Sequence, residues 1–208
     1  MYALRGPPSA ADPMAPTSTF QLVEITGLPD DKWAIDGTVF TLNNQLYMVY
    51  SGWPLDPRDP HATDENMQQL LITRMAGPVT SDGDVRMISM ADQEWEKYTE
   101  SSGRLRFINE GPQWLEMGGF KGIVYSCGAS WSPAPYLLGM LQYTGGNPLD
   151  KLGWRKWGPW LEDNRKHGIG PYSPGHCSYG LFFPLLPLAP RFPFYIPTFL
   201  DLFVKLMY

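Results

Sequence analysis

The chain has 208 residues, of which 43% are hydrophobic and 14% aromatic, and this much core material excludes wholesale disorder. Its 21 Gly and 21 Pro recur too often to leave room for long helices or a coiled coil. With 16 Lys and Arg against 21 Asp and Glu, the net charge is −5 and no basic cluster occurs, so a nucleic acid or an anionic membrane is a poor partner. Many short strands joined by turns remain, which predicts an all-β fold.

The two ends of the chain differ from its middle. Residues 1–16 have no apolar core of the kind found in a signal peptide, so we expect no export signal here. Residues 181–208 are apolar, rich in proline and broken by charged residues, and no uncharged stretch is long enough to cross a bilayer. The sequence therefore predicts one domain over 1–180, a separate tail over 181–208 and no transmembrane span.

Two hairpins are predicted from strand-forming runs separated by two-residue turns. The first joins 38–42 to 45–51 through an Asn-Asn pair, and the second joins 113–117 to 120–126 through a Gly-Gly pair. Asn and Gly tolerate the positive φ that such turns require. Other β-rich runs predict strands over 70–75, 85–90 and 136–143, whereas 56–66 reads as a solvated loop.

The two hairpins also share a pattern beyond their turns. In each one a carboxylate, Asp36 or Glu110, directly precedes a Gly expected to open the strand, and a Tyr-Ser pair closes the hairpin. Such a repeat is typical of successive blades of a β-propeller, whose first strands line the central axis. We therefore expect Asp36 and Glu110 to converge at one end of that axis.

Paired carboxylates on a rigid β scaffold suit the chemistry of a glycosidase. Cleavage of a glycosidic bond uses one protonated and one ionised carboxyl group, and sugars stack on aromatic rings. Four tryptophans lie near the acids in sequence: Trp33, Trp53, Trp114 and Trp131. From the residues alone, acids that merely occupy turns at strand ends remain the alternative.

A series of short motifs follows in a fixed order along the chain. The two that contain the acids are KWAIDGTVF at 32–40 and INEGPQ at 108–113. The others are SGW at 51–53, WEK at 95–97, VYS at 124–126, LGML at 138–141, NPLD at 147–150, WRK at 154–156 and PGH at 174–176. Taken together, they resemble glycoside hydrolase family 43, of the α-L-arabinofuranosidase type.

The resemblance implies a five-bladed β-propeller, present here as a partial propeller of about three blades. It implies cleavage of terminal α-L-arabinofuranosyl residues from plant cell-wall polysaccharide with inversion, so an arabinose-containing oligo- or polysaccharide is the expected partner. Glu110 would be the general acid, and Asp36 the carboxylate that orients it and raises its pKa.

The resemblance also implies roles outside the acid pair. Trp33, Trp53 and Ser126 would bind the sugar. His176 would help to hold, through water, a structural calcium ion on the axis, and no other cofactor is expected.

The match is incomplete at both ends. No segment of this chain resembles the family's first blade, which carries the catalytic base, and the tail over 181–208 stands where the family has its last blades. We therefore expect impaired hydrolysis, and a non-catalytic, sugar-binding propeller is the alternative. The family is typically secreted, but this chain shows no signal peptide, so its localisation stays open.

Several reactive side chains receive no role from the sequence. Cys127 and Cys177 are expected to be two buried thiols, with one disulfide as the alternative. The acids over 92–96, Glu96 included, are expected to form a solvated charged run with Trp95 packed inward.

Overall fold

The computed structural model describes residues 1–6, 19–60, 67–130, 135–162, 167–168 and 172–178. Trp131 and the tail predicted over 181–208 lie outside these residues. The described part of the chain consists of strands and two short 3₁₀ helices, which confirms the all-β prediction. Within that part, no helix has the length and apolar character needed to cross a membrane.

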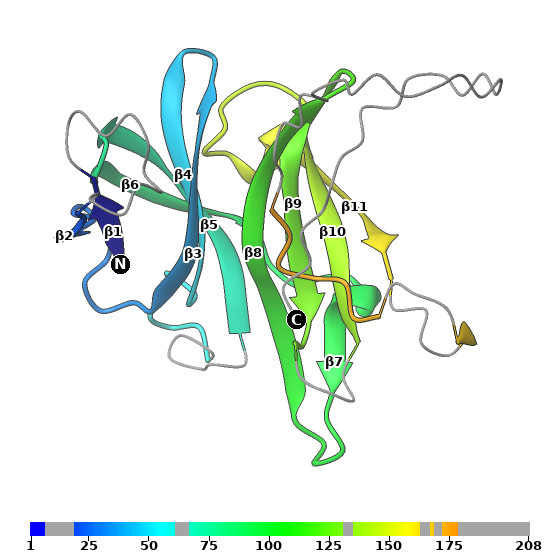
Figure 1. Ribbon diagram of the computed structural model, residues 1–208. Coiled ribbons are helices and arrows are strands. Elements are labelled where there is room, and N and C mark those ends of the chain that lie inside the picture. Colours follow the sequence, from blue (N-terminus) through cyan, green and yellow to red (C-terminus); the bar gives the residue numbers. More distant parts are fainter. Residues whose placement is uncertain (7–18, 61–66, 131–134, 163–166, 169–171, 179–208) are drawn as a thin grey trace, which may run out of the picture.

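Two four-stranded antiparallel meanders make up most of the fold (Figure 1). The first contains β3 (Ala34–Leu42), β4 (Gln45–Gly52), β5 (Met67–Gly77) and β6 (Thr80–Ser89). The second contains β8 (Leu105–Met117), β9 (Phe120–Gly128), β10 (Tyr136–Tyr143) and β11 (Trp154–Leu161). They are two blades of a partial propeller, because each blade is an up-and-down sheet that repeats around an axis.

Smaller elements connect or flank the blades. β1 (Tyr2–Arg5) and β2 (Gln21–Glu24) form a separate two-stranded sheet. Between the blades, η1 (Glu94–Glu96) leads into β7 (Lys97–Thr99), which pairs with β8, and η2 (Lys151–Gly153) precedes β11. The described residues thus contain two complete blades and one small sheet, where about three blades were expected.

Both predicted hairpins are present, and their turns use the predicted residues. Asn43 and Asn44 have φ of 51° and 61°, and Gly118 and Gly119 have φ of 58° and 84°. Positive φ at both central residues is the geometry that matches the right-handed twist of paired strands. The strands themselves extend further than predicted, most clearly at the beginning of β3 and β8.

The second strand of each blade, β4 or β9, is covered on both faces. In β4, Tyr47 and Val49 pack between the blades, whereas Met48 and Tyr50 pack on the opposite face. Successive side chains of a strand point to opposite sides of the sheet, so a strand covered on both sides is buried along both faces, as β4 is from Tyr47 to Gly52. β9 alternates in the same way between two hydrophobic clusters.

The first strands of the two blades, β3 and β8, lie side by side. The rings of Phe40 and Trp114 stack with centroids 4.4 Å apart and 7° between their planes. Nearby, Gln113 Nε2 donates a hydrogen bond to Thr38 Oγ1 at 2.8 Å. This is the arrangement expected for the innermost strands of neighbouring blades, and it brings the beginnings of the two hairpins together.

A buried ion pair lies between the blades, where the sequence predicted a solvated charged run. Glu96 is fully buried, and its carboxylate accepts a hydrogen bond from Lys156 Nζ of β11 at 2.8 Å. The prediction was therefore wrong for Glu96, although Asp92 and Glu94 are exposed and Trp95 packs against the core, as expected. The missing signal was the cation, which stands 60 positions further along the chain.

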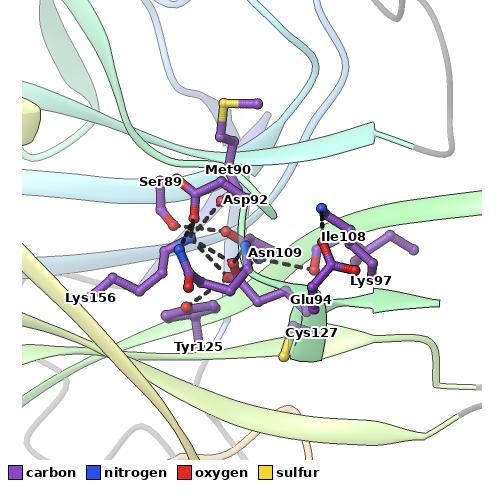
Figure 2. Close-up of polar contacts among 12 residues, drawn as sticks. Ser89, Met90, Asp92, Glu94, Lys97, Ile108, Asn109, Tyr125, Cys127 and Lys156 are labelled. Carbon is purple, nitrogen blue, oxygen red and sulfur yellow. Dashed lines mark hydrogen bonds and ion pairs between the residues drawn. The ribbon is translucent and has the colours of Figure 1, made fainter.

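Three more donors surround the Glu96 carboxylate. The Gln93 backbone N–H donates to it at 2.9 Å, Asn109 Nδ2 at 3.0 Å and the Tyr125 hydroxyl at 2.8 Å. Figure 2 shows Lys156, Tyr125 and Asn109 pointing toward one another from β11, β9 and β8. All three bond to the Glu96 carboxylate, and Gln93 reaches it from the loop before η1. An ionised carboxylate offers about four acceptor positions, so the buried charge is fully hydrogen-bonded.

Lys156→Met is expected to lower the free energy of unfolding by about 3–5 kcal/mol, because it leaves the Glu96 carboxylate buried without its cation. The double variant Glu96→Gln/Lys156→Met should lose less, since the neutral amide leaves no uncompensated charge and its oxygen can still accept from Asn109 and Tyr125, which both bond to Glu96 Oε1. Urea unfolding of both variants measures the difference. A double variant less stable than Lys156→Met would contradict this account of the pair.

The two cysteines are free thiols, as the sequence predicted, and not a disulfide. Cys127 and Cys177 are both buried, and no disulfide joins them. Burial raises the pKa of the Cys127 thiol well above its ordinary value, with the nearby Glu96 carboxylate adding to the effect, so this thiol stays protonated.

Candidate active site

Two β-bulges give the acidic residues their positions. In the β3–β4 pairing, two residues beginning at Asp36 oppose one residue of β4, and in β8–β9 two residues beginning at Gly111 oppose one residue of β9. Asp36 and Gly111 both have positive φ, 58° and 55°. A bulge of this kind bends the strand and redirects its side chains, so both hairpins turn sharply at equivalent points.

The repeat exists, but its register differs by one residue from the one expected. Glu110 pairs with Ser126, and the residue in the equivalent place, opposite Ser51, is Ile35 rather than Asp36. The glycine after each acid consequently lies inside a strand, at the bulge, and does not open it. The acid-glycine pattern was therefore off by one residue, whereas the Tyr-Ser pairs marked the true register, because backbone pairing decides which residues correspond.

Asp36 and Glu110 are nevertheless brought together, and His176 stands between them. Asp36 Oδ2 accepts a hydrogen bond from the Gly111 N–H at 3.1 Å, and Asp36 Oδ1 lies 3.5 Å from His176 Nε2. The Tyr136 hydroxyl donates to Glu110 Oε1 at 2.6 Å and lies 3.2 Å from His176 Nδ1. The two blades and the segment around residue 176 thus form one continuous polar cluster.

The segment that carries His176 reaches the cluster because two glycines leave room for it. A Cβ at Gly175 would coincide with the Tyr136 ring, and a Cβ at Gly111 would lie 3.3 Å from the His176 ring. The His176 backbone N–H donates to Ser126 Oγ at 2.6 Å. Ser126 is fully buried, so in this arrangement its hydroxyl positions the histidine.

The predicted tryptophans separate into two groups. Trp33 precedes β3 and Trp53 follows β4, and their rings stack with centroids 6.3 Å apart at 29°. Among the described side chains, Trp53 Nε1 is a buried donor without a hydrogen-bond partner. Trp114 instead packs between the blades against Phe40. Trp33 and Trp53 thus flank the first hairpin, whereas Trp114 packs against the core between the blades.

Sequence reasoning missed Tyr136 as a residue of the site and assigned it only to a strand. Tyr136 begins β10 and pairs with Gly128 of β9, two positions from Ser126. Residues two apart share a face of the sheet, so Tyr136, Ser126 and Glu110 all point to the same side. Strand alternation across the second hairpin was the signal that could have found it.

The surroundings of Glu110 favour its protonated form. Burial is the largest influence and raises the pKa of Glu110, the hydrogen bond from Tyr136 lowers it, and the nearby Asp36 charge raises it again; the net direction is upward. The expected effect of Asp36 is therefore present but smaller than that of burial. Burial and the Glu110 carboxylate also raise the pKa of Tyr136, so its hydroxyl remains a donor.

The contacts of His176 do not resemble a calcium site. Its two ring nitrogens face the Tyr136 hydroxyl and the Asp36 carboxylate, and calcium prefers six to eight oxygen ligands. In the described part of the chain, no three His, Cys, Asp or Glu side chains are arranged so that they could hold a metal ion. The calcium expected on the axis thus gains no support from these residues.

No protein-family model matches the chain. The chain is 29% identical over 180 residues to an extracellular exo-α-(1→5)-L-arabinofuranosidase of Streptomyces avermitilis, which covers 86% of this chain and 33% of that protein. The chain thus spans about a third of the length of this curated relative.

Solved structures show the same fold. The α-L-arabinofuranosidase from Lactobacillus brevis superposes with a TM-score of 0.63 at 28% identity, covering 82% of this chain and 48% of that one. A thermostable family-43 glycoside hydrolase superposes with a TM-score of 0.61 at 22% identity, covering 82% and 50%. The chain spans about half of each structure.

Asp36→Asn and Tyr136→Phe are expected to move the pKa of Glu110 in opposite directions. Removing the Asp36 charge removes a repulsion that favours protonated Glu110, so its pKa falls, whereas removing the Tyr136 hydroxyl removes a donor to the ionised form, so its pKa rises. Carboxyl carbon NMR against pH, with Glu110 assigned by Glu110→Gln, measures both without a substrate. Shifts in the same direction would refute the described electrostatics.

Proposed function

We propose that this chain, which is arabinofuranosidase-like in sequence and has the fold of family 43 glycoside hydrolases, cleaves terminal α-L-arabinofuranosyl residues from arabinose-containing oligo- or polysaccharides with inversion. The observation that carries the proposal is the convergence of Glu110 and Asp36 on Tyr136 and His176. Similarity to two arabinofuranosidases supports the choice of sugar.

In this proposal Glu110 is the general acid. Its raised pKa favours the protonated carboxyl, and its proton passes to the glycosidic oxygen as the bond to the anomeric carbon breaks. The leaving group departs as a neutral alcohol, and water attacks the sugar from the opposite face. Tyr136 fixes the orientation of the carboxyl, while Asp36 opposes its ionisation before the proton is needed.

Inversion also requires a carboxylate base that activates the water, about 6.5–9.5 Å from the acid. The resemblance assigns Asp36 the orienting role rather than that of the base, and both of its carboxylate oxygens are engaged, by the Gly111 N–H and by His176. We therefore infer slow hydrolysis, since one general acid or base contributes about 10²–10⁴ in rate.

The Trp33–Trp53 stack is proposed as the sugar platform. Both rings are partly exposed, and an aromatic face suits the apolar face of a sugar ring. We propose no nucleic acid and no membrane as partner, in keeping with the net charge of −5.

Glu110→Gln should separate substrates by their leaving groups. On arabino-oligosaccharides, whose leaving alcohol needs a proton, kcat/KM should fall by about 10²–10⁴. On 4-nitrophenyl α-L-arabinofuranoside the loss should be much smaller, because nitrophenolate leaves without protonation. Glu116→Gln is the matched control, an exposed acid of the same strand that pairs only with Lys121 at the surface. Equal losses on both substrates would contradict the acid role.

Azide should accelerate cleavage of the nitrophenyl substrate by the unmodified chain. Azide is an anionic nucleophile that needs no base, so it bypasses the activation of water and gives arabinosyl azide as product. Release of nitrophenol and calorimetric binding of arabino-oligosaccharides are measured together. Binding without any turnover, even with azide, would instead favour the sugar-binding propeller, and turnover of about 1–10³ per second without azide would refute slow hydrolysis.

A further inference from the structure

We propose that Asn109 is a positioning residue for Glu110, and that the buried Lys156–Glu96 pair acts on the site through it. The inference rests on the proposed role of Glu110 and adds three residues that do not touch the substrate. It starts from a juxtaposition in β8: the residue directly before the acid belongs to the buried network shown in Figure 2.

Asn109 and Glu110 point to opposite faces of β8. Adjacent side chains of a strand alternate, and here the Asn109 side chain contacts Glu96 and Ser89, whereas the Glu110 side chain contacts Tyr136. Asn109 is fully buried. The Asn109 side chain can therefore fix the β8 backbone from the buried face, while the Glu110 carboxyl points to the opposite face, toward the site.

Every polar group of the Asn109 side chain is used. Nδ2 donates to Glu96 Oε1 at 3.0 Å and to the Ile108 carbonyl at 3.1 Å, and Oδ1 accepts from Ser89 Oγ at 2.7 Å. Its backbone carbonyl accepts a further bond from Ser51 Oγ at 2.7 Å. Four contacts on one buried residue leave it a single orientation.

These contacts reach Asn109 from both blades. Ser51 and Ser89 belong to β4 and β6 of the first blade, whereas Lys156, which secures Glu96, belongs to β11 of the second. A bond to an ionised acceptor is shorter and stronger than one between neutral groups. Because Lys156 stabilises the charge of Glu96, the hydrogen bond from the Asn109 amide to the Glu96 carboxylate is strengthened.

The bulge explains why such support is needed at this position. Directly after Glu110 the ladder skips two residues of β8, so backbone pairing on that side of the acid is interrupted. A catalytic group must be held within about 0.5 Å of its working geometry, and a displacement of about 1 Å can cost 10²-fold in rate. Asn109 supplies the constraint that the interrupted ladder does not.

Two matched serine variants test the proposal. Ser89→Ala and Ser81→Ala each remove one buried hydroxyl from β6, but only that of Ser89 reaches Asn109, since Ser81 bonds to Thr73 and to a backbone N–H. Titration of Glu110 by carboxyl carbon NMR is the readout, and it needs no turnover. We expect Ser89→Ala to shift the pKa of Glu110 downward, toward its ordinary value, as the looser carboxyl gains solvent, while Ser81→Ala leaves it in place.

Asn109→Ala should show the same shift more strongly. Where cleavage is measurable, it should lower kcat on arabino-oligosaccharides by up to about 100-fold with KM unchanged, because the substrate still binds. An unchanged Glu110 titration in Ser89→Ala, or equal shifts in both serine variants, would overturn the proposal, the second because it would indicate general loosening. If Glu110→Gln retains full activity, the proposed function fails, yet the titrations still decide whether Asn109 positions this carboxyl.

Discussion

A single buried charge constrains how the two blades join. Placing a carboxylate in a protein interior costs several kcal/mol unless a cation and further donors meet it. Glu96 lies in the connection between the blades, its cation comes from β11 at the end of the second blade, and another donor comes from β8 at its beginning. The second blade must therefore be complete before the connection is satisfied, which couples the outermost strand to the innermost one.

Two β-bulges, rather than regular strand pairing, position the side chains of the candidate site. In both blades the first strand bulges at the same place, so side chains that a flat ladder would align are redirected. Asp36, the first residue of its bulge, has a left-handed backbone conformation, and Gly111 takes the equivalent position in the second blade. Because Gly111 has no side chain, the His176 ring can pack against it. At equivalent positions, the first blade therefore has a carboxylate and the second has space for the histidine.

The sequence predicted most of the fold, because hairpins with two-residue turns are local structures. The Asn43-Asn44 and Gly118-Gly119 turns needed only their own residues to be recognised, and the convergence of Asp36 and Glu110 followed from the repeat. Register was harder: the acid-glycine pattern was off by one position, and only the backbone ladder corrects it. Tyr136 was missed because its role depends on a partner in another strand, and Glu96 was misjudged because Lys156 lies far along the chain.

Two carboxylates of the second blade show how surroundings assign chemistry to one residue type. Glu96 receives an ammonium group and three neutral donors, so its charge is matched and its oxygens are all engaged. Glu110 is largely buried as well, but it receives only one neutral hydroxyl; burial, with a smaller contribution from the Asp36 charge, raises its pKa although the Tyr136 hydrogen bond lowers it. The surroundings of Glu96 thus favour its charged form, whereas those of Glu110 favour its protonated form. Because Asn109 bonds to Glu96 and directly precedes Glu110, two carboxyl groups with opposite electrostatic surroundings are linked through one residue of β8.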